Sequence, residues 1–215
     1  MKSHSKAFLD FRRQIVIRRR DLLRHEPGKF IFPPSGAVWT PTDREFALCE
    51  AFIVLFVAEL ETYLEYVINT SLDIFQQSFL NSGLADCSAG TSYIEKIVEK
   101  RRAWEKNNNT NWSRIGEYFV FVGMQKSKFP PNLWDDIEAI AKERGGIVHT
   151  SYGIRAVNDP RATFLRMERM TKSLQLFDKD FVDWTTRRSD ELARLKQTEN
   201  RFIPGIGSIV IKRSR

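Results

Sequence analysis

The chain has 215 residues, of which 42% are apolar and 28% charged, a balance that excludes a disordered chain and suits one globular domain with extensions. Its formal net charge of +7 and pI of about 9.5 favour a polyanionic partner such as nucleic acid. The two cysteines, Cys49 and Cys87, lack CxxC spacing, so neither a disulfide framework nor a zinc knuckle is expected.

The chain shows neither a secretory signal nor a membrane span. Its N-terminus is charged and is not followed by an apolar core, which favours a cytoplasmic protein. The most apolar run, from Ala47 to Ala58, is too short to cross a bilayer. We therefore expect this run to lie in a buried helix, and we expect no membrane partner.

Residues 1–41 are predicted to form a basic helix over 5–24 and an extended linker over 25–41. Phe8, Phe11 and Ile15 recur roughly on one side of this helix, whereas the linker is dense in proline and glycine. The helix is rich in arginine, which indicates either a solvated face or a strip that contacts the RNA backbone. The candidate RNA-binding residues are Arg12, Arg13, Arg18, Arg19 and Arg20.

A long helix is predicted from Asp43 to about Leu80. Thr42 is a good N-cap, and Glu45 three residues later completes the pattern of a capping box. A helix of this length exceeds the average, so a kink near residues 69–71 is one interpretation. Further helices are expected over 91–106, 112–124, 132–149 and 160–197, the last of them beginning at Asp159-Pro160.

These elements predict an all-α helical bundle, because almost no segment alternates with the period of a strand. The helical domain spans 42–198. The tail, 199–215, is irregular and holds a candidate short strand at 209–211. The aromatic side chains of Trp104, Trp112, Trp134 and Trp184 are expected in the core or at an interface rather than as platforms for base stacking.

Of the three histidines, only His149 lies in an apolar, helical setting, five residues after Arg144. Cleavage of RNA without a metal needs a base for the 2′-hydroxyl proton, an acid for the leaving oxygen and a fixed cation for the phosphate. Histidine suits the proton transfers and arginine suits the phosphate. His4 is expected in a frayed terminus, and His25 ends the basic helix.

The spacing of Arg144 and His149 raises a geometric problem. On a continuous helix, residues five apart differ by ~140° in direction and ~7.5 Å in height, so the two side chains would not share a face. Gly145 and Gly146 between them offer one solution, because glycine allows a helix to end or bend. A two-fold dimer offers another, since it pools Arg144 and His149 from both chains in one cleft.

The segment Glu143-Arg144-Gly145-Gly146-Ile147-Val148-His149 resembles the Arg-x(4–6)-His signature of the HEPN superfamily, and its Ile-Val-His ending is similar to that of stand-alone defence and toxin members. The likeness extends over roughly residues 43–190. Two departures stand out: Gly145 replaces a residue that is often Asn, Asp or His, and Tyr152 follows the histidine by three residues rather than two.

The resemblance implies a metal-independent endoribonuclease without a cofactor that acts as a homodimer with a composite active site. It implies cleavage by 2′-hydroxyl attack to a 2′,3′-cyclic phosphate, in a toxin–antitoxin or antiphage defence role with an antitoxin or defence partner. Arg144 would hold the phosphate and His149 would move protons. A polar side chain of the long helix, Glu61 or equally Glu59, would support the site.

Several alternatives remain open at this stage. Arg144 and His149 form a purely structural pair in one of them, and the bundle is a non-catalytic module for RNA or protein binding in another. Glu61 has the plain interpretation of a solvated helix carboxylate. The acids at 135, 136 and 138 suit the start of a helix better than a metal site, because a helix N-terminus favours negative charge.

Overall fold

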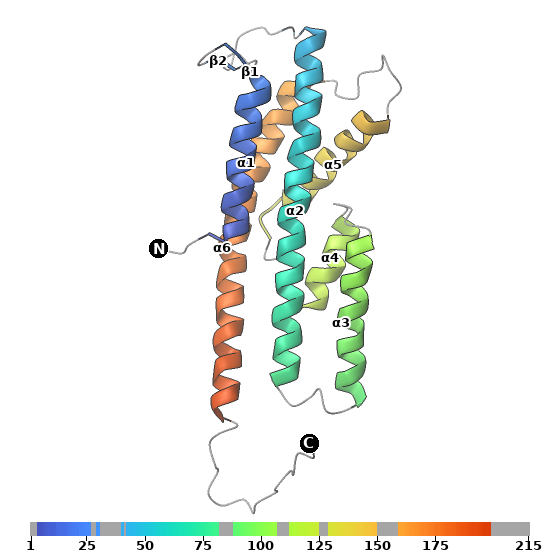
Figure 1. Ribbon diagram of the computed structural model, residues 1–215, viewed down its shortest axis with the longest axis vertical. Helices are drawn as coiled ribbons and strands as arrows, with labels where there is room; N and C mark the ends of the chain where they lie inside the picture. The colour runs from blue at the N-terminus through green and yellow to red at the C-terminus, as the bar shows by residue number, and fades with distance from the viewer. Residues whose placement is uncertain are drawn as a thin grey trace, which may run out of the picture.

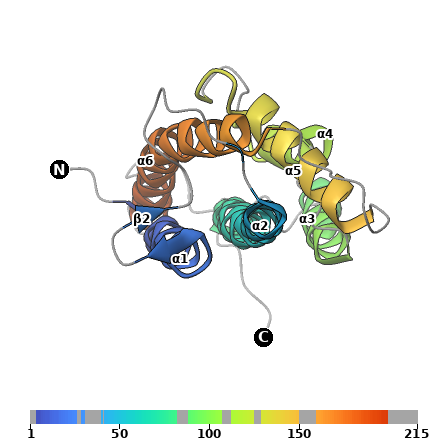
Figure 2. The same cartoon turned by 90° about the horizontal axis from the view of Figure 1, so that it is seen from above.

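The computed structural model describes residues 4–26, 29–30, 40, 42–81, 88–106, 112–124, 129–149 and 159–198. In these ranges the chain forms six α-helices and one short two-stranded hairpin, which confirms the all-α bundle. Figure 2 shows α2 (Asp43–Asn81) at the centre, with α1 (Lys6–Leu23) and α6 (Pro160–Thr198) on one side and α3 (Ser88–Lys106), α4 (Trp112–Phe121) and α5 (Leu133–His149) on the other.

The basic N-terminal helix is part of the same packed body. Ser5 caps α1 by accepting a hydrogen bond from the Phe8 backbone N–H at 3.1 Å, and both Phe8 and Phe11 are buried against α2. The chain then forms β1 (Arg24–Glu26) and β2 (Lys29–Phe30), an antiparallel hairpin at the start of the expected linker. The hairpin was not predicted, and most of the linker lies outside the described residues.

The predicted capping box begins α2. The Thr42 N–H donates to Glu45 Oε2 at 2.7 Å, and the Glu45 N–H donates in return to Thr42 Oγ1 at 3.3 Å. The helix then continues unbroken to Asn81, as Figure 1 shows, so the kink considered near residue 70 is absent. The larger side chains on one side of its apolar run are buried, which places α2 in the core, whereas Ala47, Ala51 and Ala58 are exposed, so the run is not buried all round.

Thr42→Ala is expected to lower the free energy of unfolding by about 1 kcal/mol, because it removes the side chain that satisfies a free N–H of the first turn. Thr62→Ala is the matched control, since Thr62 is exposed within the same helix and alanine is the better helix former. Urea denaturation measures both. If Thr42→Ala lowers the free energy of unfolding no more than Thr62→Ala does, the cap adds nothing to stability.

The remaining helices follow the predicted order with small shifts at their ends. Asp159 caps α6 by accepting a hydrogen bond from the Ala162 N–H at 3.1 Å, as its position before Pro160 predicted. Trp104 and Trp134 are buried and Trp184 packs partly buried against the core, as expected.

Burial raises the pKa of the Cys49 thiol to about 12, which excludes a thiolate nucleophile there. The candidate strand at 209–211 lies outside the described residues.

The start of the described chain is anchored rather than frayed, so the expectation for His4 was wrong. The carboxylate of Asp178, on α6, is fully buried and accepts hydrogen bonds from the Ser5 N–H at 2.9 Å and the Ser5 hydroxyl at 2.5 Å. The Tyr63 hydroxyl donates to it at 3.2 Å, and His4 Nδ1 lies 3.1 Å away. A buried carboxylate needs such partners, and here they join three helices.

Candidate functional site

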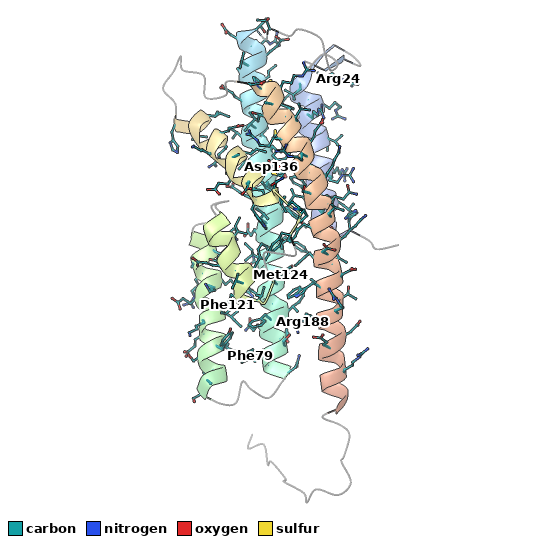
Figure 3. All side chains as sticks on the ribbon, turned by 180° about the vertical axis from the view of Figure 1, so that it is seen from behind. Arg24, Phe79, Phe121, Met124, Asp136 and Arg188 are labelled. Atoms are coloured by element: carbon teal, nitrogen blue, oxygen red, sulfur yellow. The ribbon has the colours of Figure 1, made fainter. Side chains whose placement is uncertain are left out.

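The helix that carries the Arg144–His149 motif, α5, is fixed to α6 by two charged contacts. Asp136 is 5% exposed, and its carboxylate accepts hydrogen bonds from two nitrogens of Arg169. Arg169 Nε donates to Oδ2 at 2.8 Å, and Nη2 donates to Oδ1. Glu143 pairs with Arg166 and accepts a hydrogen bond from the Thr163 hydroxyl at 2.9 Å. Figure 3 shows Asp136 on the side of α5 that meets α6.

These contacts give Asp136 a more specific role than helix-dipole stabilisation. Its carboxylate is an inter-helix partner, whereas Asp135 and Glu138 are exposed in the first turns of α5. The described residues contain no cluster of three or more His, Cys, Asp or Glu side chains that could hold a metal ion. The contacts fix where the start and middle of α5 lie, and therefore where Arg144 lies.

The glycine pair does not break α5. The helix runs through Gly145 and Gly146 to His149, so of the two solutions considered, an end or bend of the helix at the glycines is absent. Arg144 and His149 therefore differ by ~140° in direction on one continuous helix. A Cβ added at Gly145 would meet nothing within 4 Å, which leaves an open surface on that side of the helix.

Arg144 lies half-buried on the inner side of α5, in line with the buried residues Ile137 and Ile140. The carboxyl of Glu61 on α2 lies within electrostatic reach of it: burial raises the pKa of Glu61, and the positive charge of Arg144 lowers that pKa in part. Arg144 Nε is buried and has no hydrogen-bond partner among the described residues. The guanidinium group thus holds one buried donor that no described residue satisfies.

The structure distinguishes Glu59 from Glu61, which the sequence left as equal candidates for the side chain that supports the site. Glu59 Oε1 lies 3.5 Å from Arg18 Nη2 of α1, on the side of α2 away from the motif. Glu61 is displaced by ~200° around α2 and lies beside Arg144. Glu61 is therefore the carboxylate that the fold brings to the motif, and Glu59 is not.

His149 lies at the exposed C-terminal end of α5, and Figure 1 shows this end projecting from the bundle. The neighbouring Val148 side chain is 53% exposed. His149 makes no hydrogen bond or ion pair within the described residues, so its imidazole is open to solvent. One chain therefore brings Glu61 and Arg144 together but leaves His149 apart from them.

The five candidate RNA-binding arginines of α1 do not form one uniform strip. Arg18 pairs with Glu59, Arg19 Nη1 donates to Glu168 of α6 at 3.0 Å, and Arg20 Nε donates to Asp21 at 2.8 Å. Arg12 and Arg13 are exposed and make no ion pair with another described residue. Acidic neighbours thus offset the positive charge of three of the five arginines.

Glu61→Gln is expected to change how stability depends on pH. Because the pKa of Glu61 is raised on folding, the folded protein holds this proton more tightly, and wild-type stability falls as pH rises from the ordinary glutamate pKa through the raised value. Glutamine has no such proton, so the variant should gain relative to wild type over that interval. Urea unfolding at a series of pH values measures the difference.

The same contact has a spectroscopic check. Arg144→Ala should raise the Glu61 pKa further, because the positive charge that opposes the shift is removed. A carboxyl-carbon NMR titration of the two proteins measures it. Identical titration curves would mean that Arg144 does not act on Glu61.

In comparisons with known proteins, no family model, curated protein or solved structure matches the chain. Within the described part of the chain, no helix has both the length and the apolar character needed to span a membrane.

Proposed function

We propose that this protein is a metal-independent endoribonuclease of HEPN type, in which Arg144 binds the scissile phosphate and His149 transfers protons. The observation that carries the proposal is the state of Arg144. Its guanidinium is half-buried beside the Glu61 carboxyl, and its Nε is buried without a hydrogen-bond partner among the described residues. A fixed, desolvated cation is what stabilisation of a phosphate in the transition state requires.

In this proposal the active site is completed by a second copy of the chain. His149 points ~140° away from Arg144 on α5, so the helix of one protomer does not present the two groups side by side. A two-fold axis beside the end of α5 would bring His149 of one protomer to Arg144 of its partner. The open surface at Gly145 and the exposed Val148 support close approach of another helix there.

The chemistry follows from the two side chains. The imidazole of one His149 accepts the proton of the ribose 2′-hydroxyl, whose oxygen attacks phosphorus and displaces the 5′-oxygen. The second His149, entering protonated, gives its proton to that leaving oxygen. The products are a 2′,3′-cyclic phosphate and a 5′-hydroxyl. Glu61 would orient Arg144, and the role we propose in the cell is that of a toxin or antiphage defence protein.

Incubation of the purified protein with single-stranded RNA in EDTA tests this proposal. We expect cleavage with a 2′,3′-cyclic phosphate on the 5′ fragment, which resists tailing until dilute acid opens the ring and phosphatase removes the resulting phosphomonoester. His149→Ala prepared in parallel controls for a contaminating nuclease. Cleavage that needs a divalent metal, or fragments with 5′-phosphates, would contradict the mechanism.

A second candidate is a binding module without catalysis, which the solvent-exposed position of His149 favours. It predicts RNA affinity that falls steeply with salt concentration and no cleavage at any protein concentration. Filter binding across a salt series, beside the cleavage assay, distinguishes the two.

A further inference from the structure

A groove of about 480 Å³ is lined by residues of α1, α2 and α6. Its floor is apolar and comes from Phe52 and Phe56 of α2 and Phe164 and Met167 of α6. These side chains are almost fully buried, with exposed fractions of 1% to 6%. The floor is therefore closed and smooth, which suits a partner that lies along it rather than one that inserts deeply.

One exposed aliphatic side chain lines this groove, which we name the α1–α6 groove: Val16 of α1 is 67% exposed. Leu9, seven residues earlier on the same face of α1, is 51% exposed and lines a neighbouring hollow with Val16. An exposed apolar side chain beside an apolar floor suits the docking of a partner.

The rims are also positively charged. Arg12 and Arg19 line the α1 side and Lys172 lines the α6 side, while the single acid among the lining residues, Glu168, already pairs with Arg19. Arg12 and Lys172 are exposed and form no ion pair with other described residues. Two cations without protein partners, one on each rim, favour an acidic occupant.

The length and straightness of the groove fit a helix. Its α6 wall runs from Phe164 to Gln175, or ~16 Å at 1.5 Å per residue, which matches about three helical turns. RNA fits less well, because base recognition by single strands relies on exposed aromatic faces. Here the aromatic residues are buried in the floor and the exposed apolar residues are aliphatic.

We infer that the α1–α6 groove binds an acidic amphipathic helix of another protein. The apolar face of that helix would cover Val16 and the aromatic floor, and its flanking carboxylates would pair with Arg12 and Lys172. This surface lies apart from the Arg144–His149 motif, so the inference does not depend on RNA cleavage.

A fluorescent synthetic peptide with leucines at helical i, i+3, i+4 and i+7 spacing and glutamates beside them is the probe. Its control peptide has the same composition, with the leucines spread around the helix. Fluorescence anisotropy should show binding of the first peptide and at least about tenfold weaker binding of the second.

Variants locate the binding to the groove. Arg12→Glu combined with Lys172→Glu should weaken binding by at least about tenfold, and the exposed substitution Val16→Asp should do the same. Lys96→Glu combined with Arg102→Glu is the matched control, since both residues are exposed on α3 and the change in charge is equal. This control should bind like wild type.

Three outcomes would overturn the inference. One is the absence of peptide binding up to about 1 mM. Another is peptide binding that responds equally to the groove pair and the α3 pair. The third is a different occupant: labelled oligouridine that loses affinity only in the groove variants would make the groove an RNA surface. If sedimentation shows that the wild-type protein is a dimer and that the groove variants are monomers, the groove is a self-association surface.

Discussion

His149→Ala should reduce the rate of RNA cleavage by at least ~100-fold. The proposal gives His149 both proton transfers, and a positioned acid or base contributes about 10²–10⁴-fold to a rate. Arg144→Ala should cause a loss of similar size, because it removes the cation that stabilises charge on the phosphate. Glu138→Ala, exposed on the same helix, is the control that should keep full activity. Single-turnover cleavage of an end-labelled RNA measures all three.

A mixing experiment tests the claim that two chains share the site. Arg144→Ala and His149→Ala proteins, unfolded together and refolded, form mixed dimers with one intact Arg144 and one intact His149. Cleavage above that of either variant alone is expected, because the mixed dimer regains one Arg144 and one of the two His149 residues, whereas each variant dimer lacks one of the two groups entirely. No recovery, with each variant folded and dimeric, would place the complete site within a single chain.

Asp178→Ala should be the most damaging substitution for stability, lowering the free energy of unfolding by about 3 kcal/mol or more. It leaves the Ser5 N–H and hydroxyl and the Tyr63 hydroxyl buried without their acceptor. For a chain of this size that corresponds to a fall in Tm of about 6–12 °C. Calorimetry measures the change, and hydrogen exchange should show α1 losing protection first.

Two further variants calibrate that result. Tyr63→Phe removes one 3.2 Å hydrogen bond and should cost about 1 kcal/mol. Asp180→Ala, which removes an exposed carboxylate two residues along α6, should cost less than about 0.5 kcal/mol. If Asp178→Ala lowers the free energy of unfolding no more than Asp180→Ala does, the buried hydrogen bonds to Asp178 do not hold α1 in place.

The sequence predicted the helices well because their signals are local. Thr42 with Glu45 and Asp159 before Pro160 are hydrogen-bonding patterns within one turn, and the apolar spacing of Phe8 and Phe11 is a property of one helix. The hairpin after α1 gave no comparable signal, because strands of two and three residues are too short for a period to be read.

The site was predicted in residue identity but not in geometry. Whether Glu59 or Glu61 meets the motif depends on which side of α2 receives α5, and helix spacing alone does not fix that. The glycine pair offered one way for the helix to end or bend, yet a cost of about 1 kcal/mol per glycine is small beside the Glu143 and Asp136 contacts that hold this helix. Asp178 was missed because its partners lie more than a hundred residues away.

The contact between Ser5 and Asp178 spans 173 residues, which bears on the order in which the chain assembles. At ~5–20 residues per second, a ribosome needs on the order of ten to thirty seconds to add that length. During this time the face of α2 that receives α6 stays uncovered, including Phe52, whose ring later stacks on Phe164 at 5.1 Å. The nascent protein therefore exposes this aromatic face of α2 until α6 has been made, and this interval is when chaperones would have most effect on its yield.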